Sequence, residues 1–169
     1  MSVLVTYATK NGGTAGLAEM IGEALRGEGI DVDVEPVSVI NRVDGYEAVV
    51  LGAAVYNARW HPDARRFARR HAGALRDRPV WLFSSGPLDH SAEEHPIAAV
   101  KTAETAIGQV RARGHETFGG KLTSDAHGLI ARAMVRNGHG GDFRDRAHVA
   151  TWAHEIASDL RTGDQPHTV

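Results

Sequence analysis

Short apolar runs alternate along the chain with stretches in which apolar residues recur every three to four positions. Continuous runs at 3–8, 48–55 and 79–83 predict strands buried on both faces of a sheet, because no charged residue interrupts them. Apolar and charged positions alternate over 32–37, which predicts a half-exposed strand at the edge of the sheet. A fifth strand is predicted over 115–122.

The stretches between these runs have the period of amphipathic helices. Helices are predicted over 15–27, 61–75, 97–110, 129–135 and 145–160. Strands that alternate with helices are typical of a parallel sheet covered by helices on both faces and joined by right-handed crossovers. We therefore expect one α/β domain over 1–161, followed by a polar C-terminal tail over 162–169.

Three polar loops follow the predicted core strands, and ligands in such sheets bind at the carboxyl ends of the strands. The first loop combines hydroxyls and glycines at the start of a helix: Thr9, Lys10, Asn11, Gly12, Gly13 and Thr14. Unpaired N–H groups at a helix start favour a phosphate. The same loop is equally typical of a plain turn in which Thr14 caps the helix. It matches neither G-x-x-x-x-G-K-[ST] nor G-x-G-x-x-G, which disfavours nucleoside triphosphates and dinucleotides.

The second and third loops have the residues to hold a flat heterocycle. The second comprises Ala54, Val55, Tyr56, Asn57, Ala58, Arg59 and Trp60. Its Tyr56 and Trp60 rings are expected to stack on the ligand, although Trp60 as a lid on the core is the alternative. The third comprises Ser84, Ser85, Gly86, Pro87 and Leu88, which offer hydroxyl and backbone N–H groups to the edge of the ring. A phosphate at one end and a ring at the other describe a mononucleotide, and flavin mononucleotide (FMN) fits best.

Composition narrows the chemistry further. The chain has 169 residues, is 42% hydrophobic and contains no cysteine, so disulfides, thiolate nucleophiles and cysteine-bound metals are excluded and redox chemistry falls to a cofactor. No apolar run reaches the roughly 20 residues of a membrane span, and the start of the chain has no pattern of a signal peptide. We expect a cytoplasmic protein.

The formal net charge of −2 hides an uneven distribution of basic residues. Seven of the 19 lie within twenty positions: Arg59, Arg65, Arg66, Arg69, Arg70, Arg76 and Arg78. No nucleic-acid recognition motif accompanies them, so we expect no nucleic-acid partner. Solvated arginines on a helix face explain the cluster, and contact with an anionic substrate, a membrane surface or an acidic partner remains open.

Candidate catalytic groups are few. Ser84 lacks the G-x-S-x-G elbow, which argues against acyl transfer. The segment from Asp89 to His95 comes nearest to a metal-ligand spacing but is equally typical of a solvated loop, so we expect no metal site. His61 and His90 are expected near the flavin edge, either helping a proton to move or serving as ordinary loop or cap histidines. No catalytic residue is assigned.

The stretch Tyr7-Ala8-Thr9-Lys10-Asn11-Gly12-Gly13-Thr14 resembles the phosphate loop of the flavodoxin superfamily, and the resemblance covers nearly the whole length. Within the superfamily, 52–62 and 140–145 resemble the menaquinone-dependent protoporphyrinogen oxidase branch. That branch has a sizeable insertion near the last strand, and 124–141 is the only segment of this chain available for it. The resemblance implies a three-layer α/β/α sandwich with a five-stranded parallel sheet in the order 2-1-3-4-5. It also implies FMN as the cofactor, with loop 9–14 on its phosphate.

The resemblance further implies an FMN-dependent oxidoreductase that passes electrons from a small-molecule substrate to a quinone or a redox protein. Peripheral contact with a membrane through residues 59–78 would suit a quinone. The alternatives are an electron-carrying flavodoxin without its own substrate and a flavin-free scaffold or sensor. Electron carriers of this kind are acidic around the flavin, whereas this chain places arginines near the second loop, which disfavours a carrier. The sequence leaves the substrate and the oligomeric state open.

Overall fold

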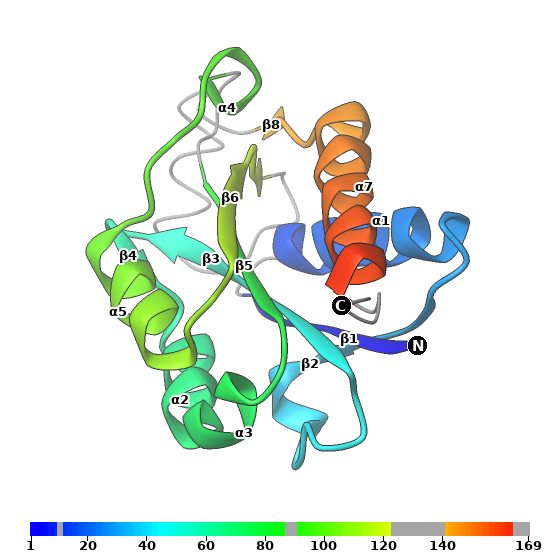
Figure 1. The fold of residues 1–169 in the computed structure, drawn as a ribbon. Helices are drawn as coiled ribbons and strands as arrows, with labels where there is room; N and C mark the ends of the chain where they lie inside the picture. Colours follow the sequence, from blue (N-terminus) through cyan, green and yellow to red (C-terminus); the bar gives the residue numbers. More distant parts are fainter. Residues whose placement is uncertain (10–11, 87–90, 123–140, 164–169) are drawn as a thin grey trace.

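A computed structural model describes residues 1–9, 12–86, 91–122 and 141–163 (Figure 1). Its main sheet contains five parallel strands in the order β2-β1-β3-β5-β6. These strands are β1 (Ser2–Ala8), β2 (Asp31–Pro36), β3 (Ala48–Tyr56), β5 (Val80–Ser85) and β6 (Gly114–Phe118). Numbered along the chain, they give the order 2-1-3-4-5, so the predicted topology is confirmed.

The strand register brings the predicted ligand loops to one edge of the sheet. Ala8 at the end of β1 pairs with Ala53 of β3, and Ala54 pairs with Ser85 at the end of β5. β1 and β5 therefore end at nearly the same level, whereas β3 continues to Tyr56. The loops that follow the three strands emerge at the same edge of the sheet. This is the edge at which ligands bind in open parallel sheets.

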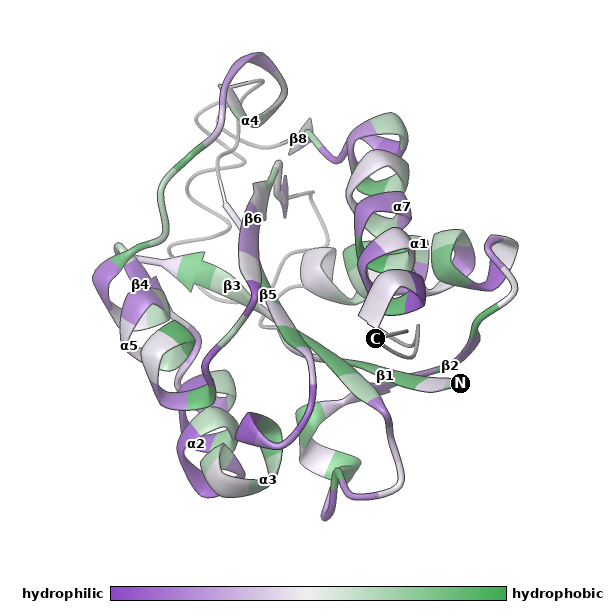
Figure 2. Ribbon diagram, in the orientation of Figure 1, coloured by the Kyte–Doolittle hydropathy of each residue, from purple (hydrophilic) through white to green (hydrophobic). Residues whose placement is uncertain are grey.

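Two long helices, α1 (Gly13–Gly27) and α7 (Arg146–Gly163), cover one face of the sheet (Figure 1). Their apolar stripes pack on residues of alternate strand positions, such as Val5 and Phe83. Aromatic rings fill the part of this core near β6: the Phe83 and Phe118 ring centroids lie 6.3 Å apart, and those of Phe118 and Trp152 lie 5.5 Å apart. Much of the central strands is hydrophobic in Figure 2, because both of their faces are covered.

The opposite face is covered by α2 (Pro62–Arg70), α3 (Ala72–Arg76) and α5 (Lys101–Val110) (Figure 1). A second apolar cluster lies there, in which Leu51 and Leu82 of the sheet pack with Phe67 of α2. The short elements are η1 (Val37–Val39), β4 (Arg59–Trp60), which pairs antiparallel with β3, α4 (Ser91–Glu94), and the two-stranded ribbon of β7 (Lys121–Leu122) and β8 (Gly141–Asp142).

Three predicted boundaries are wrong. The helix predicted over 61–75 is two helices, because His71 ends α2 with φ −102° and ψ 12° and starts α3. The helix predicted from residue 97 begins at Lys101, since Val100 is extended. The strand predicted over 115–122 stops at Phe118: the backbone passes so close to Phe143 that a Cβ atom on Gly119 would collide with the Phe143 carbonyl, and the chain then enters the separate ribbon.

Two further predictions concern the later part of the chain. The helix predicted over 129–135 lies outside the described residues, as do residues 164–169 of the predicted tail. Helix α7 continues through Gly163, so the first two residues assigned to the tail are helical. Within the described residues, no helix combines the length and the apolar character that crossing a membrane requires.

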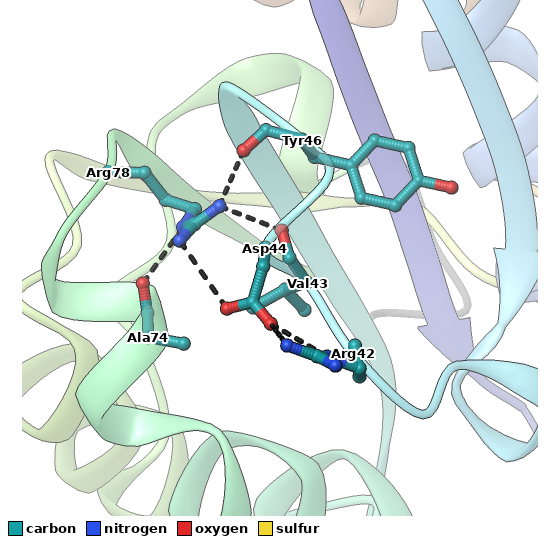
Figure 3. A network of polar contacts seen from close by, with 6 residues as sticks. All are labelled: Arg42, Val43, Asp44, Tyr46, Ala74 and Arg78. Atoms are coloured by element: carbon teal, nitrogen blue, oxygen red, sulfur yellow. Dashed lines mark hydrogen bonds and ion pairs between the residues drawn. The ribbon is translucent and has the colours of Figure 1, made fainter.

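The connection from η1 to β3 is held against α3 by one arginine (Figure 3). The Arg78 guanidinium donates hydrogen bonds to the carbonyls of Val43 and Tyr46, at 2.7 and 2.6 Å, and to the carbonyl of Ala74 at 2.8 Å. It also lies 4.0 Å from the Asp44 carboxylate, and its side chain is only 14% exposed. Arg78 therefore satisfies backbone carbonyls of a connection without regular structure, which accounts for one member of the arginine cluster.

Candidate functional site

The first loop joins β1 to α1 through a left-handed residue. Gly12 has φ 82° and occupies the N-cap position, and its backbone N–H donates to the Thr9 hydroxyl at 3.0 Å. Thr14 is therefore not the cap, contrary to the alternative interpretation of this loop. It lies in the first turn of the helix, where it is 1% exposed and its hydroxyl has no hydrogen-bond partner among the described residues. Lys10 and Asn11 lie outside the described residues.

An unpaired buried hydroxyl is costly, and the first N–H groups of a helix have no partner within the helix. The start of α1 thus presents polar groups that a phosphate would satisfy. Gly13 makes the loop compact, because a Cβ atom there would lie 3.2 Å from the Lys121 backbone. These features fit the phosphate end of a mononucleotide.

The ribbon of β7 and β8 brings two basic residues to this end of α1. Lys121 packs on Gly13, and the Arg144 guanidinium lies against Gly16, where a Cβ atom would collide with it. Asp142 holds Arg144 through contacts of 2.9 and 2.8 Å, which raises the pKa of the arginine and lowers that of the aspartate. The sequence interpretation missed both basic residues, although Gly16 inside a helical pattern was the available indication of a close contact.

The second loop is a tight hairpin rather than an open loop. Asn57 and Ala58 have φ values of 50° and 57°, and Tyr56 pairs with Arg59 across them. Positive φ at both central residues is the mark of a type I′ turn. Trp60 is fully buried in the core and its backbone N–H donates to the Thr102 hydroxyl at 2.8 Å. Of the two alternatives for Trp60, the structure favours the lid on the core, and its ring has no face free for a ligand.

A cavity of about 320 Å³ lies between the second and third loops. Residues of both loops line it, together with residues from the stretch before α5 and from β6: Val55, Asn57, Ala58, Ser84, Gly86, Ile97, Ala98, Val100 and Thr117. None of these described lining residues carries a formally charged side chain. Five of the residues assigned to the cofactor from sequence thus meet around one cavity, whose volume is at the lower end for small-molecule pockets.

The third loop is tied to β6. The Ser84 hydroxyl lies 2.7 Å from Nε2 of His115, and the Gly86 N–H donates to the Phe118 carbonyl at 2.9 Å. That N–H group is therefore not free for a ligand, contrary to the expectation that the third loop offers it. Ser85 is 7% exposed, and Pro87 and Leu88 lie outside the described residues. Burial lowers the pKa of His115 to about 4, so its ring is neutral at pH 7.

His115 is another polar residue that sequence reasoning did not single out, because nothing in its local pattern distinguishes it. His61 instead caps α2: its Nδ1 atom accepts a hydrogen bond from the Asp63 N–H at 3.1 Å. The cap alternative therefore fits this histidine, whereas His90 lies outside the described residues. Across the part of the chain that the structure describes, no three histidine, aspartate or glutamate side chains gather as a metal would require.

Comparison with known proteins places this geometry in a family. The profile described as "Flavodoxin domain" matches residues 4–139, which span the first loop, the cavity and most of the sheet. The chain belongs to the flavodoxin domain family. Membership implies FMN as the cofactor, and the start of α1, with its buried unpaired Thr14 hydroxyl, fits the phosphate of that group.

Individual relatives are more distant. The chain is 29% identical over 86 residues to "Protoporphyrinogen IX dehydrogenase [quinone]" of Escherichia coli strain K12 and, with the same figures, of E. coli O157:H7. The match covers 50% of this chain and 48% of each relative, so the chain spans about half the length of these curated relatives. Together, the family and these relatives support flavin-related electron transfer.

Solved structures agree on the fold. A flavodoxin from the domain Archaea has a TM-score of 0.61 at 13% identity, covering 95% of this chain and 99% of that chain. The rubredoxin oxygen:oxidoreductase from Desulfovibrio gigas has a TM-score of 0.63 at 15% identity, covering 95% of this chain and 36% of that chain. The flavodoxin-like sandwich predicted from the sequence is thereby confirmed.

Proposed function

We propose that this flavodoxin-family protein is an FMN-dependent oxidoreductase that oxidises a reduced organic substrate and passes the electrons to a quinone or another acceptor. The observation that carries the proposal is the cavity between the second and third loops, whose described lining residues are uncharged and which opens at the same edge of the sheet as the start of α1. Porphyrinogens are the proposed substrate class, on the strength of the name of the curated relatives.

Bound FMN would supply the redox chemistry, accepting a hydride from a reduced substrate and returning electrons to an acceptor. Thr9, Gly12, Gly13 and Thr14 would hold the phosphate at the helix start. Tyr56 would cover the ring in place of the buried Trp60. The protein thus contributes position and electrostatics.

Ser84 and Thr117 line the proposed ring site. The Thr117 hydroxyl donates to the Ile97 carbonyl at 3.3 Å, and the Ser84 hydroxyl lies 2.7 Å from Nε2 of His115. Because His115 is neutral at pH 7, it contributes no positive charge behind Ser84. One of the two atoms, the Ser84 oxygen or Nε2 of His115, donates the hydrogen bond that joins them. The pair holds the hydroxyl in a fixed direction, so that a ring edge meets an oriented dipole rather than a charge.

FMN binding tests the phosphate end first. Thr14→Val removes the unpaired buried hydroxyl and keeps the shape of the side chain, so we expect the FMN-free protein to be as stable as before or more stable. We expect FMN affinity, measured by quenching of flavin fluorescence, to fall about tenfold, the loss of one charge-assisted hydrogen bond.

Thr6→Val is the matched control, since the buried Thr6 hydroxyl also has no hydrogen-bond partner within the described part of the chain but lies within β1. Its FMN affinity should stay unchanged. If Thr14→Val bound FMN as tightly as the parent protein, the proposed position of the phosphate at the start of α1 would be wrong. A purified protein that stays colourless in excess FMN would end the proposal altogether.

Turnover separates an enzyme from an electron carrier. We expect the FMN-loaded protein to convert a porphyrinogen to the fluorescent porphyrin with menadione as acceptor, at a rate that depends on both compounds. A protein that exchanges electrons with a flavodoxin reductase but oxidises no porphyrinogen would be a carrier. The proposed contact of a quinone-using enzyme with a membrane, through exposed arginines such as Arg59, predicts that anionic vesicles raise the rate and that salt abolishes the effect.

A further inference from the structure

A second hollow lies beside α2, on the same face of the sheet as the cavity described above but at a different place. Its volume is about 300 Å³, and it is formed between η1 with the residues after it and one flank of α2. None of its lining residues also lines the cavity between the second and third loops. It is therefore a separate pocket.

The pocket has an apolar floor and a basic wall. Val37, Ile40 and Phe67 supply the apolar surface, while Arg66 and Arg70 supply guanidinium groups from successive turns of α2. Side chains four residues apart lie on the same side of a helix, so the two arginines point along one flank. Such an arrangement suits a molecule with an apolar body and an anionic group.

The positive charge of this wall is only partly balanced. Of the acidic residues that the structure describes, Asp63 alone lines the pocket, and its carboxylate lies 3.4 Å from the Arg66 guanidinium. Among the described residues, Arg70 has no ion-pair partner. Two like charges one turn apart repel each other, which leaves Arg70 to be stabilised by water or by a ligand.

Neighbouring groups do not change this balance. His71 closes the end of the pocket with its ring 4.5 Å from that of Phe67, and its pKa is lowered by burial and by Arg70, so the ring adds no charge at pH 7. Asp44, which also acts on His71, is held by Arg42 at 2.9 Å and lies 4.0 Å from Arg78. Its charge is thus already shared by two arginines.

We propose that this pocket binds a small organic anion, whose carboxylate or phosphate group pairs with Arg66 and Arg70 and whose apolar body packs on Val37, Ile40 and Phe67. The planar guanidinium groups match both anions in geometry. A hollow of this size suits a molecule of one or two rings. This binding does not depend on the redox function and gives part of the arginine cluster a role that the fold does not require.

The test uses ¹⁵N-labelled protein saturated with FMN and titrated with 2-naphthoate, 2-naphthalenemethanol and inorganic phosphate. We expect naphthoate to shift the amide resonances of Ile40, Phe67 and His71 and to leave those of Asn57 and Gly86 in place. The uncharged alcohol should bind about tenfold more weakly, because it lacks the charge-assisted hydrogen bonds. Phosphate should shift the same amides at higher concentration.

Variants assign the effect to the two arginines. Arg66→Gln and Arg70→Gln are both at exposed positions and should each weaken naphthoate binding by about threefold to tenfold. Arg69→Gln is the matched control, since Arg69 is exposed on the same helix but does not line the pocket, and its affinity should stay within about twofold of the parent protein.

Any of three results would overturn the proposal: equal binding of naphthoate and the alcohol, equal losses in Arg69→Gln and Arg70→Gln, or shifts confined to the loops at residues 55–58 and 84–86. Failure to bind FMN would leave this proposal intact, because the titration can be repeated on the FMN-free protein. Loss of the redox function and loss of the anion pocket are thus separate outcomes.

Discussion

The two faces of the sheet are closed in different ways where the strands end. On the face covered by α1 and α7, Phe83 and Phe118 fill the space with aromatic rings, and Phe143 packs against the backbone of Gly119. On the face covered by α2, α3 and α5, the neighbouring strand residues Ser84 and Thr117 are polar, and a cavity opens beside them.

This difference follows from the alternation of side chains along a strand. In β5, Phe83 faces the aromatic core and the next residue, Ser84, faces the proposed ligand site. In β6, Phe118 and Thr117 divide in the same way. The aromatic face fixes the strand ends, and the polar face can then present Ser84 and Thr117 at defined positions. Rigid support on one side is what a preorganised site on the other side requires.

The largest effect should come from crowding the aromatic face. Gly52 lies in β3 directly against the Phe83 ring, so that a Cβ atom there would collide with three ring atoms. Since Phe83 is fully buried, we expect Gly52→Ala to lower the free energy of unfolding by about 3 kcal/mol, measured by urea denaturation.

Gly73→Ala is the control on the other face. Gly73 lies in α3 with no heavy atom within 4 Å of an added Cβ atom, so alanine should raise the stability by up to about 1 kcal/mol through its helix propensity. An unchanged stability of Gly52→Ala would mean that the aromatic face is not packed more tightly than the opposite face. The proposed difference between the two faces would then be wrong.

The stability of the opposite face should depend on hydrogen bonds from Arg78 instead of on ring packing. Arg78→Ala removes the charged donor to the carbonyls of Val43, Tyr46 and Ala74. The Val43 and Ala74 carbonyls keep the backbone N–H groups of Tyr46 and Asp77 as donors, so we expect a loss of about 2 kcal/mol in thermal or urea unfolding. The exposed Arg76→Ala should stay within about 0.5 kcal/mol of the parent protein. Arg78→Lys should recover little stability, because an ammonium group does not reproduce the fork of donors. If lysine restored the full stability, the positive charge of Arg78 would explain its role and the geometry of its donors would not matter.

The fold was predictable because β1, β3 and β5 are largely apolar runs, β2 alternates between apolar and charged residues, and the helices have a clear period. The position of the ligand edge followed from the three polar loops. Elements whose boundaries depend on tertiary contacts were not predictable: α5 starts late because Val100 is extended, and His71 divides a single apolar stripe into two helices.

The details of the site were predictable only in part. The glycine at position 12 and the buried Thr14 belong to a local motif, whereas Ser84 and His115 are 31 residues apart and meet only because β5 and β6 are parallel neighbours. The hairpin at Asn57 and Ala58 was missed because an alanine with positive φ breaks the usual preference for glycine. Trp60 was expected to stack on the ligand because Tyr56 lies four residues earlier, with a lid on the core as the alternative, and the hairpin turns it into the core.

A smaller effect should appear on the polar face as the pH falls. The pKa of His115 is lowered from 6.5 to about 4 in the folded protein, so between these pH values the unfolded chain binds a proton that the folded chain does not. Stability is therefore fully present above pH 6.5 and declines as the pH falls toward 4. Because the ring is partly exposed, we expect a decline of about 1–2 kcal/mol in urea unfolding from this group.

His115→Asn should flatten that part of the pH profile, and the exposed His95→Asn should leave it unchanged. If the stability of the parent protein and of His115→Asn changed equally between pH 4 and 6.5, the ring would be protonated as easily in the folded state as in the unfolded state. The polar face would then carry a charge that the proposed ring site is expected to lack.

The smallest expected effect comes from relieving backbone strain, which occurs both at the proposed ligand site and away from it. Ala58 and Arg111 both adopt left-handed backbone conformations, with φ values of 57° and 53°, which cost a non-glycine residue about 1 kcal/mol. Replacing either residue with glycine should raise the melting temperature by a few degrees, corresponding to about 0.5–1 kcal/mol. Arg111 is the C-cap of α5 and lies outside the cavity lining, so Arg111→Gly should leave FMN affinity unchanged.

Ala58→Gly should gain similar stability but lose FMN affinity, because Ala58 lines the cavity and glycine lets the hairpin sample more conformations. Fluorescence quenching of FMN measures that loss, which we expect to be about twofold to fivefold. Unchanged affinity in both variants would mean that the hairpin takes no part in holding the ring, and the polar face would then present its ligand through Ser84 and Thr117 alone.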